Sequence, residues 1–147
     1  MIIPNWYNQK KDFIQNAINS FLTKYFSNLS SEVLLEYKDV IFYSLKWWKK
    51  IRAILALILY LKFSWKKLED LNLDDDIVKF CIAIECMHSY SLMHDDLPCM
   101  DNDEYRRWEL TVWKKFWEYN WVLAWDLLNS LTFEILSSLK SKNALQI

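Results

Sequence analysis

Glycine is absent from the 147 residues of this chain, while tryptophan occurs nine times. At a usual glycine frequency of about 7%, roughly ten glycines would be expected, so chance does not explain their absence. Glycine serves tight turns and phosphate-holding loops, where the backbone has a positive φ angle or must approach a ligand closely. The composition therefore predicts a systematic cause for the lack of glycine and the excess of tryptophan.

Other features are also missing. The longest uncharged apolar run, residues 53–61, is too short to span a bilayer, and the N-terminal segment lacks the order of a signal peptide because its basic residues follow the first apolar ones. The net charge of −1 gives no hint of a nucleic-acid partner. Three cysteines without zinc-ligand spacing favour a reduced environment. We therefore expect a cytoplasmic protein that has no transmembrane segment and binds no nucleic acid.

What is present predicts an all-α chain of single-domain size, because 53% of the residues are apolar and no strand pattern or repeat occurs. Apolar residues at helical spacing predict helices over residues 11–26, 30–45, 53–61, 77–97 and 111–139. Ser30 or Ser31 offers an N-cap for the second helix, and the acidic run at residues 74–76 offers one for the fourth. Pro98 should end the fourth helix near Leu97, because a residue before proline avoids the α region.

The stretch from residue 85 to 107 combines carboxylates with arginines at the end of that helix. Towards its end it places four aspartates next to two arginines: Asp95, Asp96, Asp101, Asp103, Arg106 and Arg107. Mg²⁺ is commonly held by one or two carboxylates plus substrate phosphates, and arginine matches phosphate oxygens with its planar fork. The pattern indicates a site for a magnesium-bridged diphosphate. A solvated acidic loop is the alternative, whereas an EF-hand is excluded by the spacing.

Helix geometry sets a condition on this site. His88, Ser91 and Asp95 share one helix face, because they lie at positions −7, −4 and 0. Asp101 lies about 240° around a continuous helix from Asp95. It can therefore join the same ion only if the backbone leaves the helix near Pro98.

The sequence DDLPCMD at residues 95–101, followed by Arg106 and Arg107, resembles the first aspartate-rich motif of the trans-isoprenyl diphosphate synthases, the polyprenyl synthetase family, in its bacterial farnesyl type. Four further segments resemble motifs of this family. WWKKIR (47–52) resembles GGKxxR, and RRWELT (106–111) resembles RRGxPT. KKFWE (114–118) resembles KKFGE, and NWVLAWDLL (120–128) resembles NAxLAGDAL. The resemblance covers about residues 44–139. It departs where tryptophan replaces glycine, where Ala53 and Leu110 replace proline, and in lacking the second aspartate-rich motif.

This resemblance implies an isoprenoid synthase-type helical bundle, of which residues 1–147 form the N-terminal half as a single partial domain. It implies a prenyltransferase that condenses isopentenyl diphosphate with dimethylallyl or geranyl diphosphate to give farnesyl or a similar short-chain prenyl diphosphate. The implied cofactor is Mg²⁺, and the full-length protein should be a homodimer. The implied metal and catalytic residues are Asp95, Asp96 and Asp101, and those that bind the two diphosphates are Lys49, Arg52, His88, Arg106 and Arg107.

Tyr90 lies five residues before Asp95, where bacterial-type farnesyl synthases have an aromatic that limits product length, so the resemblance predicts a product of about farnesyl length. On an ideal helix Tyr90 points about 140° away from Asp95, and an ordinary core tyrosine is the alternative. A non-catalytic all-α fragment or binding subunit is the rival to the enzyme as a whole. The squalene and phytoene synthase relatives fit less well because they lack the GGKxxR-like loop. We expect the 147-residue chain by itself to be inactive.

Five tryptophans fall where the family has glycine: Trp47, Trp48, Trp108, Trp117 and Trp125. This suggests that the organism reads UGA codons as glycine and that these codons were translated as tryptophan in the printed sequence. Trp6, Trp65 and Trp121 could be either residue. Trp113 should be a true tryptophan because an aromatic suits that position.

Overall fold

The computed structural model describes residues 4–29, 32, 35, 37–46, 49–116 and 118–141. The predicted N-caps Ser30 and Ser31, and the tryptophans Trp47, Trp48 and Trp117, lie outside the described residues. The helices are α1 (Asn5–Ser27), α3 (Lys38–Lys46), α4 (Ile51–Ser64), α5 (Asp76–Asp95), α6 (Val112–Lys115) and α7 (Glu118–Ser137), with a 3₁₀ turn at Leu68–Asp70. The predicted all-α fold class is confirmed.

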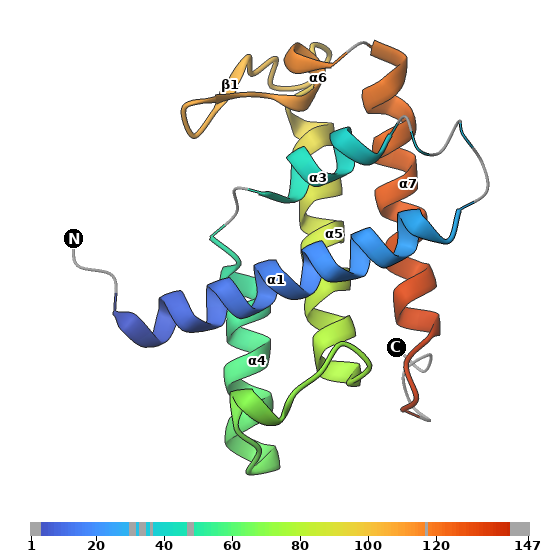
Figure 1. The fold of residues 1–147 in the computed structure, drawn as a ribbon. Coiled ribbons are helices and arrows are strands. Elements are labelled where there is room, and N and C mark those ends of the chain that lie inside the picture. Colours follow the sequence, from blue (N-terminus) through green and yellow to red (C-terminus); the bar gives the residue numbers. More distant parts are fainter. Residues whose placement is uncertain are drawn as a thin grey trace.

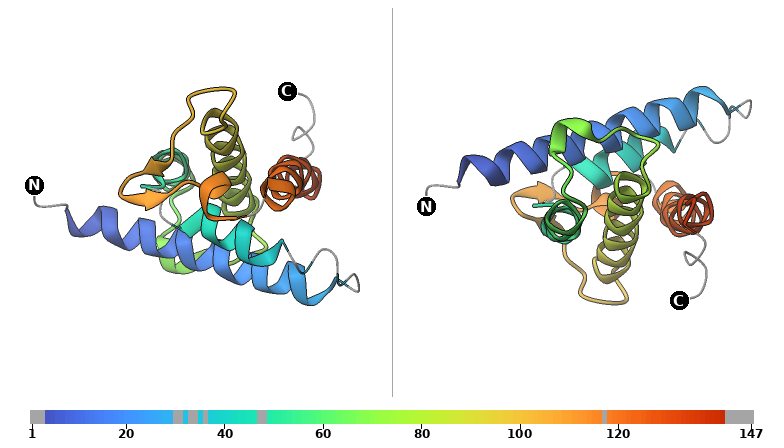
Figure 2. Two further views of the ribbon diagram at one scale, coloured as in Figure 1. Left: turned by 90° about the horizontal axis from the view of Figure 1, so that it is seen from above. Right: turned by 90° about the horizontal axis from the view of Figure 1, so that it is seen from below.

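Helix α5 is the centre of the bundle. It packs against α4 and α7, and α1 and α3 also contact it. Figure 1 shows α4, α5 and α7 side by side, with α1 crossing them. Seen along their axes, these three helices form a row, and α1 and α3 run along one side of it (Figure 2).

The sequence of α5 explains its central place. Its buried residues point to more than one side of the helix: Val78, Cys81, Ile82, Ala83, Glu85, Cys86, Ser89 and Met93. A helix that is apolar on several sides is stable only with neighbours around it. By contrast, α1 buries one stripe, which includes Ile14, Ile18 and Leu22. Burying each such side chain contributes about 1.5–3 kcal/mol.

The ends of α5 follow the predicted signals closely. The helix begins at Asp76 and ends at Asp95, which lies two residues before Leu97. Asp96 is its C-cap. The carboxylate of Asp76 accepts hydrogen bonds from the backbone N–H groups of Lys140 and Ser141, at 2.9 and 3.0 Å. The acidic run at residues 74–76 therefore also ties the start of α5 to the segment after α7.

Three predictions on secondary structure were wrong. Within the helix expected over residues 30–45, Tyr37 forms a turn and α3 begins only at Lys38. The expected helix over residues 111–139 is divided into α6 and α7, because Phe116 has an extended backbone (φ −114°, ψ 157°). A hairpin of two-residue strands, β1 (Tyr105–Arg106) and β2 (Glu109–Leu110), occurs where no strand was expected. Strands this short carry no alternating pattern from which a sequence could predict them. Among the described residues, no helix combines the length and the hydropathy required to cross a membrane.

Candidate functional site

The C-terminal end of α5 brings Asp95 and Asp101 together. The backbone N–H of Asp101 donates to the carbonyl oxygen of Asp95 at 2.9 Å, and that of Asn102 donates to the carbonyl of Leu97 at 2.9 Å. The chain thus leaves the helix before Pro98 and folds back, as the spacing required. The Asp95 side chain is 49% exposed and Asp101 is exposed, so both carboxylates are accessible from solvent.

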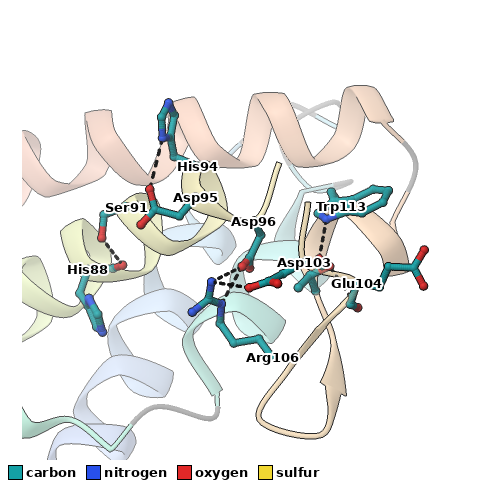
Figure 3. A network of polar contacts seen from close by, with 10 residues as sticks. His88, Ser91, His94, Asp95, Asp96, Asp103, Glu104, Arg106 and Trp113 are labelled. Carbon is teal, nitrogen blue, oxygen red and sulfur yellow. Dashed lines mark hydrogen bonds and ion pairs between the residues drawn. The ribbon is translucent and has the colours of Figure 1, made fainter. Parts of the chain in front are cut away.

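Asp96 has a different environment from its neighbour. Its side chain is only 6% exposed, and Oδ1 accepts a hydrogen bond from Nε of Arg106 at 2.6 Å and contacts Nη2 as well. Burial raises the pKa of Asp96, and the hydrogen bond from Arg106 opposes that rise. Figure 3 shows the adjacent carboxylates directed to different partners, Asp95 to His94 and Asp96 to Arg106. In this arrangement the carboxylate of Asp96 holds an arginine.

The hairpin fixes that arginine. Arg106 pairs with Glu109 and Tyr105 with Leu110, and the hydroxyl of Tyr43 donates to the carbonyl of Leu110 at 2.7 Å. Further along, Thr111 Oγ1 and Trp113 Nε1 each donate to the carbonyl of Asp103 at 2.8 Å. The Asp103 carboxylate also accepts from Nη2 of Arg106 at 3.4 Å. The loop, the hairpin and the start of α6 are therefore tied into one unit (Figure 3).

His88 lies among cations from separate segments. Nη1 of Arg52 contacts His88 Nε2 at 3.2 Å. Because a guanidinium only donates, Nε2 accepts and the ring proton is assigned to Nδ1. Burial, followed by the charges of Arg52, Arg107, Lys50 and Arg106, lowers the pKa of His88 to about 4. The imidazole is thus neutral at pH 7, and the charges of the predicted residues Arg52 and Arg107 both act on His88.

Two further features belong to the polar region, the exposed Lys49 and a pocket beside Arg106. The carbonyl of Lys49 accepts a hydrogen bond from the Tyr7 hydroxyl at 2.5 Å, and its side chain is exposed. A small pocket of about 50 Å³ lies against Asp96, Arg106 and Arg107. Its other walls come from α3, α5 and the hairpin strands, so charged groups meet apolar side chains such as Leu92 and Met93.

Tyr90 packs against α7. Its ring stacks on Trp125 with 5.2 Å between centroids and 11° between planes. The ring of His94 lies 5.3 Å from the same indole. The Trp125 Nε1 atom is buried with no hydrogen-bond partner among the described residues. The contact places an aromatic pair between α5 and α7, close to the end of α5 that carries Asp95.

Two charged residues at the site were missed by the sequence analysis. Lys50 and Glu85 are each 1% exposed, and Lys50 Nζ lies 3.8 Å from Glu85 Oε2. A signal was present, since Glu85 is the one acidic residue within the apolar run FCIAIECM of residues 80–87. A charge at such a position needs a buried partner.

The donor set suits a hard cation only in part. Asp95 and Asp101 supply carboxylate oxygens, which Mg²⁺ prefers. In the part of the chain that the structure describes, no group of three or more His, Cys, Asp or Glu residues could hold a metal ion. Mg²⁺ ordinarily keeps waters and takes its remaining ligands from substrate phosphates. A cation held by Asp95 and Asp101 would therefore need its remaining ligands from water and a diphosphate.

The sequence pattern of the polyprenyl synthetase family matches residues 36–147. A farnesyl diphosphate synthase from Buchnera aphidicola subsp. Schizaphis graminum is 34% identical over 128 residues, which is 86% of this chain and 41% of that protein. The farnesyl diphosphate synthase of Escherichia coli is 56% identical over 55 residues, which is 37% of this chain and 18% of that protein.

Solved structures agree with the sequence comparison. A geranyltransferase from Helicobacter pylori matches 99% of this chain and 50% of its own, with a TM-score of 0.67 and 31% identity. An FPP/GFPP synthase from Zymomonas mobilis matches 95% of this chain and 46% of its own, with a TM-score of 0.72 and 28% identity. The chain spans no more than half the length of these relatives. The match over residues 36–147, on a fold shared with these solved structures, shows that the chain belongs to the polyprenyl synthetase family.

Proposed function

We propose that the gene product containing this chain is a prenyltransferase that condenses isopentenyl diphosphate with an allylic diphosphate, dimethylallyl or geranyl, to give farnesyl or a similar short-chain prenyl diphosphate. The family and the names of the relatives support the reaction class. We also propose that the protein is a cytoplasmic homodimer, as the resemblance implied.

The single observation that carries the proposal is the meeting of opposite charges at the end of α5. Accessible carboxylates at Asp95 and Asp101 lie on one backbone unit, which is tied through Asp96 and Asp103 to Arg106. The backbone that carries the two accessible carboxylates is thus tied to the guanidinium before any ligand arrives. Such preorganisation is what a site for a metal-bound diphosphate requires.

The residues then have separable tasks. Asp95 and Asp101 would hold Mg²⁺, which when bound supplies positive charge that stabilises the departing diphosphate. Arg106 uses Nε and Nη2 for Asp96 and Asp103, so we assign its Nη1 to the allylic diphosphate. The role of Asp96 is then to orient Arg106.

The second diphosphate belongs to the other cationic group. Arg52 and Arg107 surround neutral His88, and we assign Lys49 to the same group because it precedes Arg52 on the segment that enters α4. Neutral His88 can donate one hydrogen bond from Nδ1 without adding charge. The double bond of isopentenyl diphosphate would attack the allylic cation, and a proton would then be lost.

The test is metal-dependent release of diphosphate. The purified gene product is incubated with geranyl or dimethylallyl diphosphate, isopentenyl diphosphate and Mg²⁺, and the products are separated by chromatography. We expect elongation with both substrates, and its abolition by EDTA. If diphosphates bind but no elongation occurs under any of these conditions, the non-catalytic binding subunit is the correct description and the enzyme proposal fails.

A further inference from the structure

The N-terminal end of α4 begins with a lysine that is both buried and in a left-handed backbone conformation. Lys50 is the N-cap of α4 with a left-handed backbone, φ 55° and ψ 27°. Its side chain turns into the protein and is 1% exposed, and Nζ donates to the carbonyl of Leu45 at 2.6 Å. Lys50 therefore faces the core, although its neighbour Lys49 is exposed.

Glu85 on α5 meets both Lys50 and the start of α4. Oε2 of Glu85 lies 3.8 Å from Lys50 Nζ, and Oε1 accepts the backbone N–H of Ala53 at 3.3 Å. The first four N–H groups of a helix have no partner within it, and a lysine N-cap has no acceptor for them. Glu85 thus supplies from the neighbouring helix the acceptor that the cap lacks, and its charge faces the positive end of α4.

The position of this contact matters for the site. Glu85 and His88 lie one turn apart on α5, and Lys50 and Arg52 lie two residues apart at the start of α4. Fixing Glu85 against Lys50 and Ala53 therefore fixes the register at which Arg52 meets His88 at 3.2 Å. On the other side, the Tyr7 hydroxyl of α1 holds the carbonyl of Lys49.

We propose that Lys50 and Glu85 form a buried positioning pair, which sets the cationic segment 49–52 for its diphosphate without touching it. This rests on the proposed function, because the diphosphate is that of isopentenyl diphosphate. Neither side chain can reach a ligand, since both are enclosed by protein. Their effect on binding must therefore pass through Lys49 and Arg52.

The test compares Glu85→Gln, Lys50→Met and Lys50→Arg in the gene product. For Glu85→Gln and Lys50→Met we expect KM for isopentenyl diphosphate to rise tenfold or more, while KM for the allylic diphosphate changes less than twofold. Lys50→Arg keeps the buried cation and should stay within about threefold of the parent. An unchanged KM for isopentenyl diphosphate in Glu85→Gln overturns the proposal.

Two further measurements separate this proposal from the proposed function. Hydrogen exchange at the amide of Ala53 should be faster in Glu85→Gln, and calorimetry with inorganic pyrophosphate should show weaker binding. These results support the pair even if the parent protein elongates no substrate. Equal pyrophosphate affinity in the parent and in Glu85→Gln overturns it. Should Glu85→Gln not fold, Glu85→Asp gives the same comparison, because its shorter side chain withdraws the carboxylate from Ala53.

A second inference comes from the backbone and goes beyond the proposed function. Trp65, the C-cap of α4, has φ 58° and ψ 15°, and Trp108 in the hairpin turn has φ 72°. Their side chains project into solvent, with exposed fractions of 92% and 99%. A bulky residue with positive φ is an outlier, because its Cβ is crowded by the backbone.

Both positions are ones at which glycine is the usual residue. The residue after a helix that adopts the left-handed conformation is most often glycine. In the hairpin, Arg107 and Trp108 both have positive φ, 54° and 72°, as in a two-residue type I′ turn. Such turns favour Asn-Gly or Gly-Gly. Neither indole contributes buried contact area to offset the strained backbone.

Other tryptophans are used as tryptophan. Trp113 donates its Nε1 hydrogen to the carbonyl of Asp103 at 2.8 Å, and Trp121 is 9% exposed within the core. We infer that positions 65 and 108 are glycine in the protein as the cell makes it, encoded by UGA, whereas 113 and 121 are tryptophan. The complete absence of glycine from the printed sequence agrees with this inference.

The test is to read the codons at these positions and to measure peptide masses of the protein purified from its own organism. We expect UGA at 65 and 108, UGG at 113 and 121, and peptide masses that correspond to glycine at the first two positions. UGG codons or tryptophan masses at 65 and 108 overturn the inference. A folding experiment gives a second reading: Trp108→Gly should raise the urea midpoint and Trp113→Gly should lower it. A fall for Trp108→Gly would contradict the backbone argument.

Discussion

The Nε atom of Arg106 lies 2.6 Å from Oδ1 of Asp96, which joins the hairpin to the C-cap of α5. The Asp96 side chain is 6% exposed, while that of the adjacent Asp95 is 49% exposed. Consecutive carboxylates therefore have different tasks. One orients an arginine from inside the protein, and the other faces solvent, where a cation and a diphosphate can approach.

Arg106→Met should destabilise the protein. It leaves the carboxylate of Asp96 buried without its partner, for which we expect a loss of about 3 kcal/mol in the free energy of unfolding. Lys114→Met is the matched control, because its ion pair with Glu104 is exposed and is worth less than about 1 kcal/mol. Urea denaturation of both variants measures the difference. Similar losses in the two would show that the pair with Asp96 has no special weight.

Asp95→Asn and Asp101→Asn should impair catalysis far more than folding. Both side chains are accessible, so we expect the free energy of unfolding to stay within about 0.5 kcal/mol of the parent. Loss of a metal-holding carboxylate should lower Mg²⁺-dependent diphosphate release by about 100-fold or more. The exposed Asp74→Asn serves as control and should retain full turnover. Near-normal turnover in Asp95→Asn would remove that residue from the site.

His88 should make stability fall in acid. Its pKa is about 4 in the folded protein, against an ordinary value of 6.5. Between these values the unfolded chain binds a proton that the folded protein does not, so the free energy of unfolding falls as the pH falls from about 6.5 towards 4.

Denaturation midpoints measured from pH 7 to pH 4 check this dependence. His88→Gln should reduce the slope, because the titrating imidazole is gone. If His88→Gln and the parent have identical profiles, the cations around His88 do not act on it as described.

Tyr90→Ala should lengthen the prenyl product. The ring of Tyr90 lies between α5 and α7, next to position 125. Removing it opens space close to the end of α5 that carries Asp95, whether position 125 is tryptophan or glycine. Chromatography of the products should show a shift from about farnesyl length to longer chains. Tyr60→Ala on α4 is the control and should leave the distribution unchanged. If Tyr90→Ala also leaves it unchanged, another residue limits product length.

Local features of the sequence determined much of the site by themselves. The helical period placed His88 and Asp95 on one face and turned Tyr90 towards another side, where it meets α7. Proline at position 98 required the helix to end, and the chain does fold back so that Asp101 reaches Asp95. These predictions depend on backbone geometry over fewer than about ten residues, which neighbouring segments change little.

Only the tertiary structure decided which charges are buried and which face solvent. Nothing in the local pattern separates Lys49 from Lys50, yet one is exposed and the other lies against Glu85, 35 residues further along the chain. The partner of Asp96 likewise depended on a hairpin too short to be read from the sequence. The sequence alone does not show whether a charged side chain will be removed from solvent on folding. That cost, and the partner that offsets it, are set when α4, α5 and the hairpin pack together.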